Sequence, residues 1–153
     1  MTRVAPRWLI GAGIVLSAAG LLPLLGLTAG AHGIGLILLA EVIEGVGTGL
    51  AGPVILTASL RAVAREDTGA ASAASSAAGQ LGSSIGTALL NTIAATATAA
   101  YLLAHAGAAT RAQTVHTTAI VHGYTVAAAW GAGILLVLVI PIAWLINAKG
   151  PAR

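Results

Sequence analysis

The chain alternates between long apolar runs and shorter stretches that hold most of its charges. The apolar runs cover about residues 8–29, 34–60, 70–103 and 123–147. Each is longer than the about 20 residues that an α-helix needs to cross the roughly 30 Å hydrocarbon core of a bilayer. The pattern therefore predicts an all-α fold, an integral membrane bundle of four transmembrane helices, in a single domain that covers residues 1–153.

Two connections between these runs are polar enough to lie in water. Residues 61–69 gather four charged side chains and predict a short cytoplasmic loop. Residues 104–122 contain Arg111, Gln113, His116 and several threonines, and predict a longer outer loop. An apolar run behind a basic start can also be a secretory signal peptide, but the first run exceeds the roughly 7–15 apolar residues of such a peptide.

Composition supports a membrane protein over a soluble one. Hydrophobic residues make up 58% of the 153 residues and charged residues 7%, whereas a soluble domain carries about 25% charged residues. Mean hydropathy is +0.96. The 20 glycines and the absence of Phe indicate helices that pack backbone against backbone. The lipid bilayer is therefore the first expected partner.

The basic residues are distributed unevenly between the two sides of the predicted bundle. Arg111 falls on one side, and the other six fall on the opposite side: Arg3, Arg7, Arg61, Arg65, Lys149 and Arg153. Cytoplasmic loops carry the excess of Lys and Arg in membrane proteins. We therefore expect a multi-pass protein of the plasma (inner) membrane with both termini in the cytoplasm. Basic residues confined to span ends give no indication of nucleic-acid binding.

Two carboxylates lie deep inside the second apolar run and are the sharpest candidates for chemistry. A charge in mid-bilayer costs a few kcal/mol, so Glu41 and Glu44 are candidates for a proton or substrate pathway. Both share a helix face with Gly45 and Gly49. The alternative is a structural role, in which each carboxyl forms hydrogen bonds with a neighbouring helix or reaches the interface.

The third apolar run carries a polar stripe formed by Gln80, Ser84, Thr87 and Asn91. These side chains would either line an aqueous cavity or form hydrogen bonds between helices. Four glycines, in two pairs spaced four residues apart, are candidates for close helix packing: Gly45, Gly49, Gly82 and Gly86. Pro53 removes a backbone donor and predicts a kink in the second span.

The aromatic residues of the last run divide into two kinds. Tyr124 and Trp144 lie near its ends, where amphipathic rings favour the membrane interface. Trp130 lies too deep for that explanation.

Several classes of function find no support in the sequence. The four histidines are scattered without the spacing of a metal site. There is no Cys, no phosphate-binding loop, and no nucleophile paired with a base. We therefore expect no metal, no cofactor and no enzymatic activity.

The order of several short motifs resembles the major facilitator superfamily, in its fourteen-span drug:proton antiporter branch. A Gly-rich span ends in GVGTGLAGP, a short loop and helix start follow as REDTGAAS, and the next helix carries QLGSSIG. A polar loop and a last span opening with Gly123-Tyr124 complete the order. The resemblance covers almost the whole chain and implies that it corresponds to the last four spans of such a transporter.

The resemblance implies a part of a proton-coupled, multidrug-type efflux transporter that does not transport alone. Its expected partners are other transmembrane helices, supplied by the missing spans or by self-association, and a lipophilic small-molecule substrate. Two alternatives stay open: a small self-associating four-helix exporter, and a membrane protein that binds partner helices without transporting.

Overall fold

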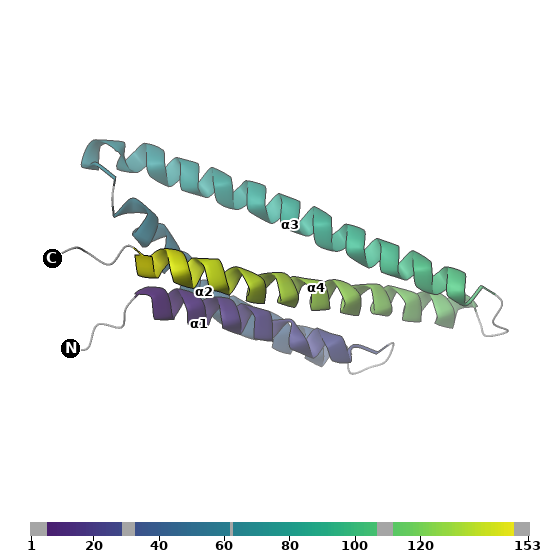
Figure 1. Cartoon of the computed structure of the whole chain (residues 1–153). Coiled ribbons are helices and arrows are strands. Elements are labelled where there is room, and N and C mark those ends of the chain that lie inside the picture. The colour runs from purple at the N-terminus through teal and green to yellow at the C-terminus, as the bar shows by residue number, and fades with distance from the viewer. Residues whose placement is uncertain (1–5, 29–32, 62, 107–111, 149–153) are drawn as a thin grey trace.

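The computed structural model describes residues 6–28, 33–61, 63–106 and 112–148. In this part of the chain, 94% of the residues are helical and none lies in a strand. Four long antiparallel helices and two short 3₁₀ turns follow one another (Figure 1): α1 (Pro6–Gly20), η1 (Leu22–Gly26), α2 (Gly33–Leu60), η2 (Arg65–Asp67), α3 (Thr68–Ala104) and α4 (Ala112–Ala148).

Within the described residues, four helical segments are long and apolar enough to cross a membrane: Pro6–Gly26, Gly33–Leu60, Arg65–Ala104 and Gln113–Ile142. This confirms the predicted fold class.

The connection between α3 and α4 is shorter than predicted. Residues 104–122 were expected to form a loop, but residues 112–122 are the first turns of α4, so that prediction is wrong for them. Within this helical stretch the hydroxyls of Thr117 and Thr118 donate back to the carbonyls of Gln113 and Thr114, at 2.9 Å each. At 1.5 Å per residue α4 is about 55 Å long, which exceeds the hydrocarbon core.

The first apolar run is interrupted. One helix was expected over residues 8–29, but α1 ends at Gly20 and the chain continues as the 3₁₀ turn η1. Pro23 explains the break, since it has no N–H to donate and its ring clashes with the carbonyl four residues earlier. The bonds across η1 accordingly span three residues, from Leu24 N to Leu21 O and from Leu27 N to Leu24 O, each 3.2 Å.

Helix α2 continues through Pro53 without interruption. Just after the proline, the hydroxyl of Thr57 lies 2.8 Å from the carbonyl oxygen of Pro53 and 3.0 Å from that of Val54. The kink expected at Pro53 stays a prediction.

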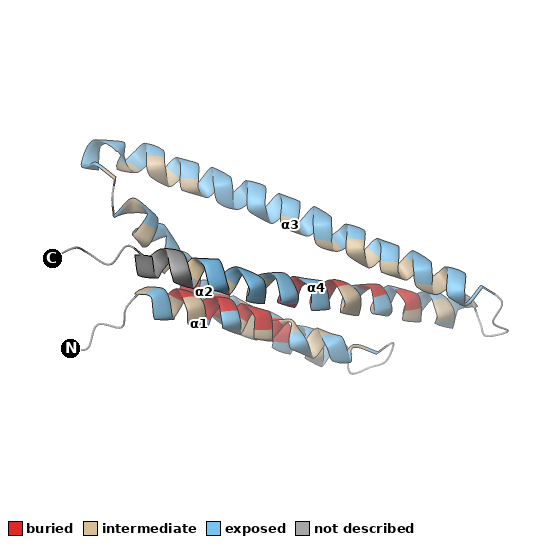
Figure 2. Ribbon diagram, in the orientation of Figure 1, coloured by how far each residue is buried: buried red, intermediate tan, exposed pale blue. Residues whose placement is uncertain are grey.

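The core of the bundle lies where α1 packs on α2 and α4 (Figure 2). Small residues bring α1 and α2 into backbone contact. A Cβ atom built on Gly13 would lie 2.7 Å from the carbonyl oxygen of Gly47 and 2.8 Å from the Cβ of Ala51, and one built on Gly47 would overlap Ser17. Any side chain at these two glycines would push the helices apart.

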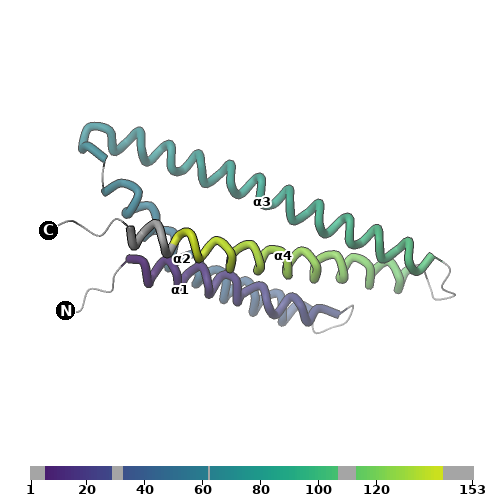
Figure 3. The backbone as a smooth tube through the Cα atoms, in the orientation of Figure 1, coloured from purple at the N-terminus to yellow at the C-terminus, as the bar shows by residue number. Residues whose placement is uncertain are grey.

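Helix α3 stands apart from this core. Near its C-terminal end it lies against α4, where a Cβ at Gly123 would overlap Thr98 and Ala94. Toward its N-terminus it diverges from α4, as the tube in Figure 3 shows. No residue of α3 is buried, and Leu81 and Ile85 are 65% and 68% exposed.

One end of the bundle gathers the described basic residues. The start of α1, the connection between α2 and α3, and the end of α4 lie together (Figure 1), and Arg7, Arg61 and Arg65 belong to the first two of these segments. Because the start of α1 and the end of α4 lie at the same end of the bundle, the chain runs along the bundle an even number of times. The side of the membrane that it faces stays a prediction.

Candidate functional site

A cavity of about 390 Å³, open to the surface, lies where η1, α2, α3 and α4 meet. Three polar side chains line it: Glu41 from α2, Asn91 from α3 and Tyr124 from α4. The rest of the lining is apolar: Leu21, Leu24, Leu27, Ile37, Leu90, Ala94, Ala127 and Ala128. Apolar walls with a few convergent polar groups are typical of small-molecule sites.

The break in α1 builds one wall of the cavity. Leu21, Leu24 and Leu27 all line it because a 3₁₀ helix has three residues per turn, which places every third side chain on the same side. In a membrane protein, such irregular backbone is found where it is buried in protein or lines a cavity.

The contact between α3 and α4 sets the position of the other two polar side chains. Gly123 packs against Ala94 and Thr98, and Tyr124 is the next residue on α4. Asn91 lies one turn before Ala94 on α3. Small residues at this contact bring both polar side chains to the rim of the same space.

The structure therefore brings together two of the predicted pathway residues, Glu41 and Asn91. Glu44 does not line this cavity. It is half-buried against the end of α1, where a Cβ at Gly20 would lie 2.7 Å from the Glu44 amide nitrogen and 3.0 Å from the Glu44 Cβ. The two glutamates, which the sequence could not separate, thus occupy different environments.

The other three candidates of the polar stripe lie on the diverging half of α3. Gln80, Ser84 and Thr87 are exposed, and the Ser84 hydroxyl donates to the carbonyl oxygen of Gln80 at 2.9 Å. This bond uses the only proton of the hydroxyl, so Ser84 can act toward any further partner as an acceptor. A cavity-lining role for these three residues stays a prediction.

The four glycines expected to pack helices do not contact another helix within the described chain. No atom lies within 4 Å of a Cβ built on any of them: Gly45, Gly49, Gly82 and Gly86. Packing at these positions stays a prediction about helices outside this chain. The close contacts between α1 and α2 include the pairs Gly13/Ser17 and Gly47/Ala51, whose four-residue spacing is the sequence signal that could have identified them.

Tyr124 lines the cavity, which the sequence did not predict, and its expected position at the membrane interface stays a prediction. A cluster of aromatic side chains lies where α3 ends and α4 begins. The Tyr101 ring stacks on His105, with centroids 4.1 Å apart, and lies 5.2 Å from His122. His105 Nδ1 is 2.8 Å from the Tyr101 carbonyl oxygen.

Among the described residues, no group of three His, Cys, Asp or Glu could hold a metal ion.

The arrangement in the cavity suits a positively charged, mostly apolar ligand. The Glu41 carboxylate supplies a counter-ion, and the Asn91 carbonyl and Tyr124 hydroxyl supply acceptors.

Comparison with known proteins relates nearly the whole chain to part of a resistance protein. The chain is 40% identical over 149 residues to puromycin resistance protein pur8 of Streptomyces alboniger. The match covers 95% of this chain and 28% of that protein, so the chain spans less than a third of the relative's length. No protein-family model and no solved structure matches the chain.

Proposed function

We propose that this chain is one part of a multidrug-type, proton-coupled efflux transporter. The observation that carries the proposal is the cavity in which Glu41 faces apolar walls from four helical segments. Similarity to a puromycin resistance protein over 95% of the chain supports it independently. Export of a toxic compound is one direct way in which a membrane protein confers resistance.

In this proposal Glu41 exchanges a proton for a lipophilic cation. The carboxylate holds the cation as counter-ion, and protonation from the outer side releases it. Asn91 and Tyr124 orient the cationic group, while the leucines of η1 contact its apolar part. Glu44 is the nearest alternative acid, since it lies one turn further along α2.

We further propose that the transporter is the major facilitator type that the sequence motifs resemble, with this chain as its last four spans. Such transporters bind substrate between repeats of several helices. The unburied helix α3, with its open positions at Gly82 and Gly86, supplies a surface for the remaining spans. In this arrangement the basic end of the bundle faces the cytoplasm of a cell whose inner membrane holds a proton gradient.

The test is pH-gradient-driven efflux of a lipophilic cation from lipid vesicles. The chain by itself should give no efflux above empty vesicles, and the chain combined with the remaining spans of a matching transporter should give clear efflux. Efflux by the lone chain would instead favour a small self-associating exporter. Absence of efflux with every combination of partner spans, despite co-purification with them, would favour a membrane protein that only binds other helices.

A further inference from the structure

The Glu41 cavity ends against a glycine that does not itself line it. A Cβ atom built on Gly131 of α4 would lie 3.1 Å from Leu21 Cδ1, 3.6 Å from Leu90 Cδ1 and 3.7 Å from Leu90 Cδ2. Both leucines line the cavity, whereas Gly131 is buried and does not belong to the lining. The two side chains therefore lie against α4 at a position where this helix has no side chain of its own.

This contact lies at the end of the cavity that is nearest to the basic end of the bundle. Helices α1 and α3 both begin at the basic end, and Leu21 and Leu90 are the first cavity residues that the chain reaches from there. Helix α4 runs back toward the same end, and its part of the lining stops at Ala128, one turn before Gly131. Leu21 and Leu90 thus form the floor of the cavity.

The missing side chain at Gly131 determines how far this floor extends into the cavity. At 3.1 Å from Leu21 Cδ1, a Cβ would already be closer than the about 3.5–4.0 Å that is optimal for two carbon atoms. The branched side chain of Gly131→Val would extend further and displace both leucines. Since the open side of both leucines is the cavity that they line, we expect them to move into it and make it shallower.

We propose that Gly131 is a positioning residue, which sets the depth of the Glu41 cavity by letting Leu21 and Leu90 lie against α4, and thereby sets the size of the largest cation that the cavity admits. The control of depth follows from these contacts, and the effect on cation size rests on the proposed function. A hydrophobic pocket discriminates by about 10–200-fold for a single methylene. A small displacement of the floor is therefore sufficient to change which ligands fit.

A reporter cysteine measures the depth of the cavity without any transport. The chain contains no Cys, so Ala128→Cys places a single thiol in the lining, one turn from Gly131. The chain in dodecyl maltoside micelles is labelled with methyl or with benzyl methanethiosulfonate, and mass spectrometry follows both reactions. Gly131→Val should slow the benzyl reagent about tenfold relative to the methyl reagent.

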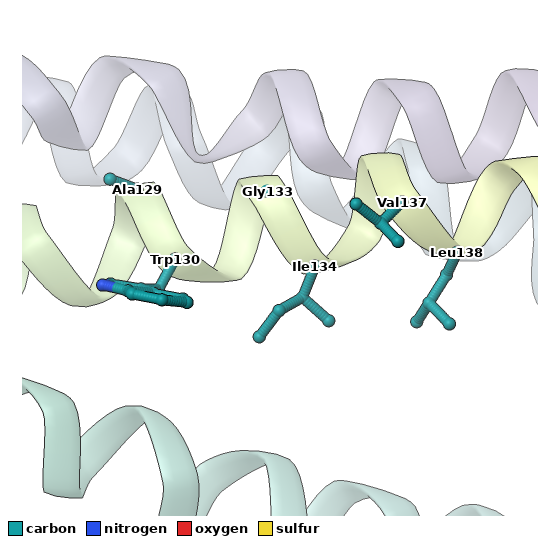
Figure 4. Close-up of a pocket in the computed structure, with 6 residues that line it drawn as sticks. All are labelled: Ala129, Trp130, Gly133, Ile134, Val137 and Leu138. Atoms are coloured by element: carbon teal, nitrogen blue, oxygen red, sulfur yellow. The ribbon is translucent and has the colours of Figure 1, made fainter.

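Two further variants distinguish a displaced floor from a damaged helix. Leu21→Ala, added to Gly131→Val, removes the nearer displaced side chain and should restore the benzyl rate. Gly133→Val is the matched control, because Gly133 lies in the same helix but lines a separate hollow beside Trp130 and Ile134 (Figure 4), and a Cβ there would meet no atom within 4 Å. This control should keep the parent ratio of the two rates.

Circular dichroism selects the variants that fold. If Gly131→Val does not fold, Leu21→Ala alone gives the converse test, because a deeper cavity should speed the benzyl reagent relative to the methyl reagent.

Binding of tetraalkylammonium ions tests the effect on cation size. Isothermal titration calorimetry of the chain in micelles compares the series from tetramethylammonium to tetrabutylammonium. Gly131→Val should weaken the binding of the largest ion that the parent binds by about tenfold or more and leave the smaller ions unchanged. Leu21→Ala in the same chain should restore the binding of the larger ion.

The two measurements can fail separately. An unchanged ratio of benzyl to methyl labelling in Gly131→Val would overturn the proposal, and so would a changed ratio that Leu21→Ala does not restore. Equal weakening of all ions would overturn the effect on cation size. If the parent binds no ion while the labelling ratio changes as expected, the proposed cation site is wrong and the control of cavity depth by Gly131 is confirmed.

Discussion

Gly20 at the end of α1 packs directly against the backbone of Glu44 in α2. A Cβ at Gly20 would lie 2.7 Å from the Glu44 amide nitrogen. This contact holds the Glu44 side of α2 against α1 and leaves Glu41, one turn earlier, at the cavity shared with α3 and α4. The two acids, three residues apart, thus lie in different environments.

Gly20→Ala should therefore destabilise the chain by about 1–3 kcal/mol, the usual cost of overpacking a tight contact. Gly11→Ala in the same helix is the control, because no atom lies within 4 Å of a Cβ there, and Ala is the better helix former by about 1 kcal/mol. Thermal unfolding in detergent, followed by circular dichroism, measures both. Equal melting temperatures for the two variants would contradict the close contact at Gly20.

Gly86→Leu should not destabilise the isolated chain, because Leu is a better helix former than Gly and a Cβ at Gly86 meets no atom of another helix in the described part of the chain. If α3 packs on helices of partner spans through this face, the same variant should reduce co-purification with those spans. Gly69→Leu, also in α3 and also open, is the control. Unchanged co-purification of Gly86→Leu with the partner spans would show that this face of α3 contacts lipid or an open cavity.

The topology prediction follows from the basic residues at one end of the bundle. Reporter fusions at Gly69 and at Gln113 should report opposite sides of the membrane, with Gly69 in the cytoplasm. These residues lie near the beginnings of α3 and α4, at opposite ends of α3 (Figure 1). Reports from the same side would eliminate the four-span topology.

Span lengths and charge positions were sufficient to predict four helices, because a bilayer leaves few structures that satisfy the backbone. The effect of each proline could not be predicted. Pro23 follows shortly after Gly20 and ends α1, whereas α2 continues through Pro53, two residues beyond Ala51, which packs on Gly13 of α1. The two prolines therefore have different outcomes, although each lies within an apolar run.

The candidate site was predictable in part. The rarity of acids inside apolar runs singled out Glu41, and the polar stripe singled out Asn91. Their proximity depends on how α3 crosses α4 at Gly123, and Tyr124 enters the cavity through the same crossing. Sequence spacing within one helix cannot fix the angle between two helices. The residues that line the cavity together with Glu41 could therefore be identified only from the structure.

We propose that Glu41 carries proton-coupled efflux, and one substitution tests this role most directly. In a transporter assembled from this chain and its partner spans, pH-gradient-driven efflux of a lipophilic cation from vesicles is measured for Glu41→Gln and for Glu66→Gln. Gln keeps the shape and most hydrogen bonds of Glu but cannot exchange a proton, and Glu66 lies in η2, outside the cavity. We expect Glu41→Gln to abolish efflux and Glu66→Gln to retain it. Full efflux by Glu41→Gln would contradict the claim, and loss of efflux in Glu44→Gln instead would transfer the role to Glu44.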